Sequence, residues 1–509
     1  MRNKTIFFIL VLFSTNLSPF NWKGALEDII GLSPLGSIVY QELKGKDNIN
    51  EHQEYYYPKY YNTTAEPPTT TNVTFEDVVG LEEVLIEIQE TVEFLKNPHR
   101  FITMGAELPK GILLEGPPGT GKTLIARAIA GEAGCAFYQA NGSEFHKTYV
   151  GEGPQAIRSL FEKARDNAPS VVFIDEIDAV GSKRSDDGSA AGNEFNAMVG
   201  ELLAQMDGFK KDSGIVVIGA TNLAKNLDTA LLRPERFSRQ IKIPLPTKNG
   251  RCQILEYYLK KLPPGKLDLP INQISGEISQ LSGKVSPADL KNIVNEAAIV
   301  AVRHDSNVIN MDHFILALDR LQLGIKNKLE QTLKQRKRTA YHESGHAIIK
   351  ILKKEPVSRI TIESRGHALG ATFGKATSDT ETADLTKEKL LDKIMISQAG
   401  GAAEEIIFGN KTLGISDDQK RAEEYARILI EFFGTEKFPG VGSIPSSETM
   451  KYEIDKEVLS ILQNCLQKSK ELLMSNKEML DELANTLLKK ETMSEDEIYK
   501  TLGMRKPAY

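Results

Sequence analysis

Short apolar runs alternate with segments of helical periodicity from Phe75 to about residue 250. Short runs of this kind, bounded by turn residues, are typical of buried strands. They occur at 111–114, 171–174, 215–220 and 240–243. Because strands that alternate with helices form a parallel sheet covered on both faces, this region predicts an α/β core.

Beyond residue 250 the strand signals fade and helical periodicity dominates. Helices are predicted at 281–303 and 311–323, as a small lid that follows the α/β core. From Arg336 onward the pattern is again mainly helical, apart from a predicted strand pair at 360–362 and 371–373. The chain is therefore predicted to contain an α/β core at 75–248, a helical lid at 249–325 and a mainly α-helical domain at 326–509.

The first 74 residues have a different character. Two basic residues close to Met1 precede an unbroken apolar run at 6–13. A charged start and an apolar run predict a membrane anchor or a signal-like segment at 1–22. A tyrosine cluster, followed by threonines and prolines, gives residues 23–74 the composition of a linker.

Composition narrows the class of protein. With 40% hydrophobic and 26% charged residues, the 509-residue chain can bury sizeable cores. Its net charge of −6 and its dispersed lysines and arginines do not resemble the basic surface of a nucleic-acid-binding protein. Cys135, Cys252 and Cys465 lie far apart and form no CxxC pair, which argues against a disulfide framework and against a cysteine zinc site.

A glycine-rich motif follows the first predicted strand. It matches G-x-x-x-x-G-K-[ST] with Gly116, Pro117, Pro118, Gly119, Thr120, Gly121, Lys122 and Thr123. Glycines allow backbone N–H groups to curl around phosphates, and the N-terminus of the following helix adds a favourable dipole. Lys122 supplies a positive charge to the phosphates, and Thr123 offers a hydroxyl to Mg²⁺. The motif therefore predicts binding of ATP and Mg²⁺.

Acidic and polar residues follow the next predicted strands. Asp175 is predicted to hold the Mg²⁺ shell, and Glu176 to polarise the attacking water. Asn222 ends a later strand, where it is placed to orient that water. Arg236 and Arg239 are candidate arginine fingers for the phosphate of a neighbouring subunit, which requires a ring.

The C-terminal region contains a second motif, H-E-x-x-H, formed by His342, Glu343 and His346. On a helix the two histidines share one face, so both imidazoles can reach one zinc ion. Glu343 lies beside the metal and is the candidate general base that takes a proton from the attacking water. The motif predicts zinc-dependent hydrolysis of a peptide bond.

A catalytic zinc ion needs a third protein ligand and one open position. Asp417 and Asp418, which precede a predicted helix at 420–433, are candidates. The adjacent Glu404 and Glu405 are alternatives. Spacing alone leaves the choice among these carboxylates open.

The two motifs, in this order, resemble the FtsH family of membrane-anchored ATP-dependent zinc metalloproteases. The resemblance covers roughly Val73 to the C-terminus. Besides the motifs it rests on the segments 75–80, 109–111, 173–180, 220–222, 231–240, 288–290, 340–347 and 400–409. It implies an α/β AAA+ P-loop ATPase module with a helical lid, followed by a mainly α-helical zinc metallopeptidase domain of the M41 type.

The resemblance also implies roles for individual residues. The family's third zinc ligand follows a Gly-x-Ser-x pattern, which residues 414–418 match, so the resemblance selects Asp418. Arg236 and Arg239 match the family's two finger positions, and 207–209 matches its inter-subunit signalling segment. The segment near the adenine and the pore loop, where an aromatic residue grips an unfolded chain, correspond to Val79, Gly80, Tyr149, Val150 and Gly151.

The implied function is unfolding and translocation of protein substrates by a homohexameric ring, followed by zinc-dependent peptide hydrolysis, in membrane protein quality control. The implied partners are unfolded or membrane proteins and, through the N-terminus, membrane lipid, with no nucleic acid. The implied location is a bacterial inner membrane with cytoplasmic catalytic domains, or alternatively an organellar inner membrane. The chain departs from the family at Tyr149, where Phe is commoner, and at Glu235, where glycine is usual. It has one clear apolar segment where typical bacterial members have two membrane spans.

Two other functions make different predictions. An AAA+ unfoldase or remodelling ATPase with a silent peptidase predicts a broken zinc motif. A peptidase that binds nucleotide without turnover predicts the loss of Glu176 or Asn222. Because both motifs are complete, the sequence favours the coupled protease.

Overall fold

The structure is a computed structural model that describes residues 71–105, 110–146, 151–183, 190–208, 214–326, 331–366, 369–375, 385–434 and 447–507. The predicted N-terminal anchor and the pore residues Tyr149 and Val150 lie outside these ranges. None of the described helices is long and apolar enough to cross a membrane. All of the described residues belong to one compact unit of the chain.

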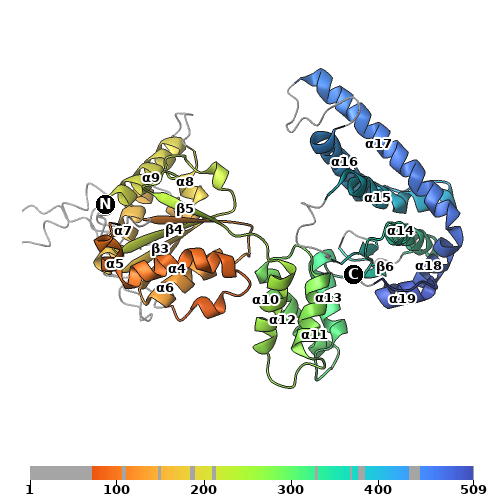
Figure 1. Cartoon of the computed structure of the whole chain (residues 1–509), viewed down its shortest axis with the longest axis horizontal. Helices are drawn as coiled ribbons and strands as arrows, with labels where there is room; N and C mark the ends of the chain where they lie inside the picture. The colour runs from red at the N-terminus through yellow and green to blue at the C-terminus, as the bar shows by residue number, and fades with distance from the viewer. Residues whose placement is uncertain are drawn as a thin grey trace, which may run out of the picture. The chain divides into compact units, whose positions relative to one another are not determined.

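A five-stranded parallel sheet forms the centre of the N-terminal half of the described chain (Figure 1). Its strands are β1 (Gly111–Glu115), β2 (Ala136–Asn141), β3 (Ser170–Asp175), β4 (Ile215–Thr221) and β5 (Phe237–Lys242). They lie in the order β2-β3-β4-β1-β5, and all neighbours are parallel. The apolar runs predicted four of these strands, although β5 begins earlier than expected. The mixed sequence of β2 gave no such signal.

Helices cover both faces of the sheet (Figure 1). One face carries α4 (Glu82–Lys96) and α6 (Lys122–Ala133), and the other carries α7 (Glu152–Asp166) and α9 (Ala190–Asp207). Alternate side chains of β1 enter the two cores, Leu113 on the α7 side and Ile112 and Leu114 on the α6 side. Short elements complete this part: η1 (Phe75–Asp77), α5 (Pro98–Thr103), η2 (Gly142–Phe145), α8 (Asp178–Gly181) and η3 (Ala224–Asn226).

A group of helices with its own core follows the sheet. It consists of α10 (Lys248–Lys260), α11 (Ile271–Leu281), α12 (Pro287–Arg303) and α13 (Met311–Leu323). The helix predicted at 281–303 is confirmed from Pro287 onward, but its predicted start is wrong, because Leu281 ends α11 and α12 begins only at Pro287. Proline is favoured in the first turn of a helix, and the Ser286 hydroxyl accepts a hydrogen bond from the Asp289 N–H as an N-cap.

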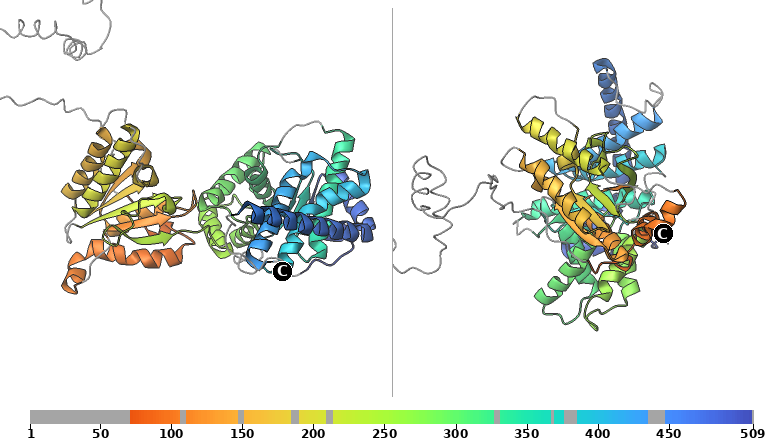
Figure 2. Two further views of the ribbon diagram at one scale, coloured as in Figure 1. Left: turned by 90° about the horizontal axis from the view of Figure 1, so that it is seen from above. Right: turned by 90° about the vertical axis from the view of Figure 1, so that its left-hand side faces the viewer.

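The C-terminal part is mainly helical and has a separate apolar core. Its helices are α14 (Leu333–Leu352), α15 (Lys387–Phe408), α16 (Ser416–Ile428), α17 (Glu448–Ser475), α18 (Lys477–Lys490) and α19 (Glu495–Thr501), with a 3₁₀ turn η4 (Leu413–Ile415) and a π-helical segment η5 (Leu429–Phe433). Helix α15 packs between α14 and the long α17, which is blue in Figure 2. The helix predicted at 420–433 begins at Ser416, so Asp417 and Asp418 lie in its first turn and do not precede it.

A small antiparallel sheet lies beside α14. Its strands are β6 (Arg359–Thr361), β7 (Ala371–Phe373) and β8 (Thr492–Ser494), in the order β7-β6-β8. The predicted pair is therefore confirmed, while the third strand comes from far along the chain and was not predicted. Strand β7 is an edge strand that contacts α14.

Candidate functional sites

The glycine-rich loop connects β1 to α6 at the carboxyl edge of the parallel sheet. Helix α6 begins at Lys122, directly after Gly121, whose φ of 97° lies in the left-handed region that glycine tolerates. Strands β3 and β4, which carry the other predicted residues, lie next to each other, and β4 lies next to β1. The sheet order thus gathers the loop and the strand ends at one edge, where ligands bind in open α/β sheets.

The Lys122 ammonium is held inside this loop. It donates hydrogen bonds to the backbone oxygens of Gly116 and Pro117, at 2.7 and 2.9 Å, and to Oδ1 of Asn222 at 2.9 Å. Burial lowers the pKa of Lys122, and the charges of Asp175 and Asp178 oppose that effect. The structure thus brings together Lys122 and Asn222, which the sequence analysis assigned separate roles at the phosphate site.

The predicted Mg²⁺ residues also meet. The Thr123 hydroxyl donates to Oδ2 of Asp175 at 3.0 Å. Glu176, the next residue, is exposed and has a φ of 49°, so its backbone turns sharply at the end of β3. A hydroxyl and a carboxylate within hydrogen-bonding distance, beside a phosphate loop, are suitable ligands for Mg²⁺.

The two candidate arginine fingers have partners within their own chain. Arg236 donates two hydrogen bonds to the Asp207 carboxylate, at 2.9 and 2.7 Å. Arg239 donates to the backbone oxygen of Glu87 at 3.1 Å and pairs with Glu90. Neither guanidinium is hydrogen-bonded to residues 116–123 of its own chain.

The other residues predicted to contact the nucleotide or the substrate lie in separate parts of the chain. Val79 packs against the core of the α10–α13 helices, and Gly80 follows it with a φ of 76°. Gly151 is the residue before α7 and is exposed. Its predicted neighbours in the pore loop are outside the described residues.

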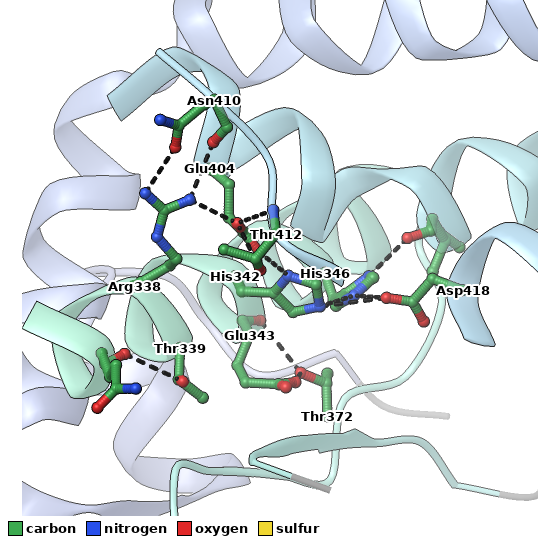
Figure 3. A network of polar contacts seen from close by, with 12 residues as sticks. Arg338, Thr339, His342, Glu343, His346, Thr372, Glu404, Asn410, Thr412 and Asp418 are labelled. Atoms are coloured by element: carbon green, nitrogen blue, oxygen red, sulfur yellow. Dashed lines mark hydrogen bonds and ion pairs between the residues drawn. The ribbon is translucent and has the colours of Figure 1, made fainter. Parts of the chain in front are cut away.

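The H-E-x-x-H motif lies in the middle of α14. The side chains of the three predicted zinc ligands, His342, His346 and Asp418, converge (Figure 3). Nε2 of His342 and Nε2 of His346 are 3.1 Å apart, and each is 3.1 Å from Oδ2 of Asp418. Asp418 comes from the first turn of α16, so the fold joins residues that are distant in sequence. Two imidazoles and one carboxylate are the ligands of a catalytic zinc ion with an open position.

The Nδ1 atoms of both imidazoles, which point away from the predicted zinc position, already have hydrogen-bond partners. Nδ1 of His346 lies 2.7 Å from the backbone oxygen of Ile396, which can only accept a hydrogen bond, so Nδ1 carries the proton. Nδ1 of His342 lies 2.9 Å from Oε1 of Glu404, whose pKa is below its usual range. With both protons on Nδ1, two Nε2 lone pairs face one carboxylate oxygen. A cation resolves that repulsion, so the donor set fits zinc.

Helix α15 leaves room for the metal because residue 400 is glycine. A Cβ at Gly400 would lie 2.5 Å from Nε2 of both His342 and His346. No real Cβ approaches nitrogen atoms so closely, so any side chain here would displace the two imidazoles.

Of the four carboxylates that spacing left open, the structure brings Asp418 to the histidines as a potential ligand. The Asp417 side chain is 81% exposed and pairs with Lys420. Glu405 binds Lys470 and Lys411 on the surface. Arg421 donates to Oδ1 of Asp418 at 3.1 Å, which leaves Oδ2 directed at the histidines.

Glu404 has a different place from the one that spacing suggested, behind the ligands (Figure 3). Its buried carboxylate receives hydrogen bonds from Arg338 at 2.9 Å and from the Thr412 N–H at 3.0 Å, besides its contact with His342. Burial alone would raise the pKa of Glu404, but the contacts with His342 and Arg338 outweigh burial and lower it. Glu404 therefore stays ionised and fixes the ring of His342.

Charge also couples the histidine and aspartate side chains of this site to one another. Burial opposes the charged form of His342, but hydrogen bonds to Asp418 and Glu404 outweigh burial and raise its pKa to about 10. Burial likewise opposes ionisation of Asp418, but the two histidines lower its pKa well below the usual range.

Comparison with known proteins agrees with this geometry. The family model "ATPase family associated with various cellular activities (AAA)" matches residues 112–245, the AAA+ lid domain matches 277–316, and peptidase family M41 matches 330–501. The ATP-dependent zinc metalloprotease FtsH of Thermobaculum terrenum is 39% identical over 466 residues, which cover 88% of this chain and 70% of that protein.

The chain belongs to the FtsH family of ATP-dependent zinc metalloproteases.

Two further members of the family extend the comparison. FtsH 2 of Bdellovibrio bacteriovorus is 41% identical over 454 residues, 84% of this chain and 72% of that protein. The mouse ATP-dependent zinc metalloprotease YME1L1 is 37% identical over 516 residues, 99% of this chain and 67% of that protein. As a member of the FtsH family, the chain is an ATP-dependent zinc metalloprotease that uses Zn²⁺, ATP and Mg²⁺.

Several residues around the FtsH-type zinc site were missed by the motifs. Gly400 was noted only as part of the segment 400–409 that carries the resemblance. The Ile396 backbone oxygen on α15 and Arg338, one turn before the motif, carry no local signal of their own. Glu404 carried a signal, its adjacency to Glu405, but spacing could not separate a ligand from a residue that orients a ligand. Thr372, on the edge strand β7, was seen only as part of a predicted strand.

Proposed function

We propose that the two sites act in sequence on one substrate chain, so that ATP hydrolysis unfolds and translocates a protein and the zinc site cleaves its peptide bonds. The observation that carries this proposal is the convergence of His342, His346 and Asp418 in a chain that also has a complete phosphate site. The proposal assigns residues 75–248 to the ATPase core, 249–325 to its lid and 326–509 to the peptidase.

In the ATPase, Lys122 and the backbone of 116–123 hold the phosphates, while Thr123 and Asp175 hold Mg²⁺. Glu176 polarises the attacking water and Asn222 orients it. The 3.0 Å contact between Thr123 and Asp175 supports the Mg²⁺ assignment. Val79 and Gly80 contact the adenine.

In the peptidase, His342, His346 and Asp418 hold zinc, which supplies a Lewis acid for the scissile carbonyl. Glu343 takes a proton from the attacking water and delivers it to the leaving amine. The residue Glu343 is buried and directly follows His342 in sequence, which supports a role at the reacting atoms. Glu404 and Arg421 orient the ligands.

The ring is a homohexamer in which Arg236 and Arg239 reach the nucleotide of the adjacent subunit. Tyr149, Val150 and Gly151 grip the substrate in the central pore. Asp207, which binds Arg236 here, lies in the proposed signalling segment, so nucleotide contact across the interface competes with an intrachain ion pair. The substrates are unfolded and membrane proteins.

Residues 1–22 anchor the enzyme to lipid, and 23–74 link the anchor to the ring. The location is the bacterial inner membrane with cytoplasmic catalytic domains, with an organellar inner membrane as the alternative. The apolar run at 6–13 and the family membership support the anchor.

Casein degradation by the purified full-length chain tests the coupling. Wild type, Glu343→Gln and Lys122→Ala are compared with zinc, with and without ATP. We expect degradation by wild type only with ATP, and none by either variant, while Glu343→Gln still hydrolyses ATP. If wild type hydrolyses ATP and never cleaves casein, the chain is instead a remodelling ATPase with a silent peptidase.

A further inference from the structure

The Glu343 carboxylate has one hydrogen-bond partner among the residues that the structure describes. The hydroxyl of Thr372, in the edge strand β7, lies 2.7 Å from Oε2 of Glu343 (Figure 3). The same hydroxyl oxygen lies 3.1 Å from the backbone oxygen of Glu343. Both acceptors of this hydroxyl therefore belong to Glu343, and the carboxylate oxygen is the nearer and the charged one.

Strand β7 holds Thr372 in place by backbone pairing. Thr372 is the central residue of β7 and is paired with Ile360 of β6, which is fully buried. A β-branched side chain in a strand has few χ1 rotamers, so the hydroxyl has a nearly fixed position. The hydrogen bond from Thr372 therefore fixes the Glu343 carboxylate relative to the small sheet, which contributes no zinc ligand.

Gly370 confines the same carboxylate from another side. A Cβ at this position would lie 2.9 Å from both Cγ and Oε1 of Glu343, and 2.8 Å from Cγ2 of Thr339. The backbone before β7 therefore passes directly against the Glu343 side chain, and only glycine allows this approach.

We propose that Gly370 and Thr372 form a holder that positions the Glu343 carboxylate for proton transfer. Thr372 fixes Oε2, which leaves Oε1 to receive the proton of the attacking water. Among the described residues, the Thr372 hydroxyl is hydrogen-bonded to Glu343 and to none of the three zinc ligands, so Thr372 acts through Glu343 as a positioning residue. The inference rests on the proposed role of Glu343 as general base.

The expected size of the effect follows from the hydrogen bond that is lost. A hydrogen bond to a charged group favours one orientation by about tenfold or more, which corresponds to about 1.4 kcal/mol. General-base catalysis contributes about a hundredfold to ten-thousandfold in rate. Loss of the holder should therefore remove part of the rate and leave substrate binding unchanged.

Thr372→Val, which keeps the shape and removes the hydroxyl, is the decisive variant, and Thr372→Ser should restore the contact. Thr361→Val is the matched control, because the Thr361 hydroxyl in β6 bonds to the Thr492 hydroxyl at 2.8 Å and not to Glu343. The full-length enzyme is assayed with zinc and ATP on a fluorogenic unfolded protein. We expect kcat to fall about tenfold in Thr372→Val with KM unchanged, and to stay within about twofold of wild type in the other two variants.

Zinc content and ATPase rate are measured in every variant, and neither should change. If Thr372→Val loses zinc and so reports misfolding, Gly370→Ala replaces it; it should show the same fall in kcat with zinc retained.

Several outcomes would overturn the inference. They are a wild-type kcat in Thr372→Val, an equal loss in Thr361→Val, or no rescue by serine. Glu343→Gln separates this result from the proposed function. If that variant cleaves normally, the assignment of the base fails; if it is inactive while Thr372→Val behaves as wild type, only the holder fails.

Discussion

The phosphate site and the zinc site are built in different ways from the same chain. At the phosphate site, backbone atoms and short loops form the cradle, and its residues follow strands that are neighbours in one sheet. At the zinc site, side chains from α14, α15 and α16 meet in a helical core, with β7 at its side. The first site therefore depends on local conformation, and the second on how helices pack.

This difference predicts how each site should fail. A site made by packing should collapse when a single methyl group enters the wrong place. A site made by backbone conformation should weaken gradually, because a strained loop can still fold around its ligand.

Gly400→Ala should have the largest effect. Its Cβ would lie 2.5 Å from both ligating nitrogens, so we expect zinc to be lost and peptidase activity to fall about a thousandfold or more. Gly401→Ala is the matched control, since its Cβ would meet the Ile415 side chain, with Cγ2 nearest at 3.2 Å, and Cδ of Lys411 at 3.8 Å, but neither histidine. Metal analysis and casein cleavage check the pair, and ATPase activity should survive in both. If Gly400→Ala retains zinc, the zinc site does not depend on close helix packing in the way proposed.

Glu404→Gln should have an intermediate effect. A neutral amide cannot hold the Nδ1 proton of His342 as firmly, so zinc affinity should fall about tenfold to a hundredfold. Competition with a zinc chelator measures this directly. Glu405→Gln should bind zinc as wild type does, because Glu405 binds two surface lysines. Equal affinities in the two variants would mean that Glu404 does not orient the ligand.

Gly121→Ala should have the smallest effect. The added Cβ meets nothing within 4 Å, so the only cost is the left-handed conformation, about 1–2 kcal/mol. We expect ATP affinity to fall about tenfold while zinc binding is unchanged. Gly134→Ala introduces the same strain after α6, away from the phosphate loop, and should lower stability without weakening ATP binding. A similar loss of ATP affinity in both would assign the effect to general destabilisation.

The same contrast explains what the sequence could predict. Lys122, Thr123 and Asp175 lie in short motifs flanked by strands with strong apolar signals, so the sequence could assign the residues to one site and predict the strands that carry them. His342 and His346 also belong to one short motif, so the sequence identified them directly. Asp418 could not be identified in this way, because its approach to the histidines depends on α16 packing against α15, and only the family resemblance selected it.

Errors in the predicted fold also have physical causes. The break between α11 and α12 is set by a serine cap and a proline inside a continuous apolar pattern. Strand β8 pairs with β6 across more than a hundred residues, a contact without local signal. Glu404 and Thr372 could not be assigned their roles from sequence, since each acts through a histidine or glutamate on another element.

The most direct test of the zinc site is the metal content of Asp418→Asn beside that of Asp417→Asn. The two variants remove the same charge from adjacent residues of one helix turn, yet only Asp418 faces the histidines. The account predicts about one zinc ion per subunit in wild type and in Asp417→Asn, and almost none in Asp418→Asn after dialysis against a chelator. Full zinc in Asp418→Asn, or its loss from Asp417→Asn, would contradict it.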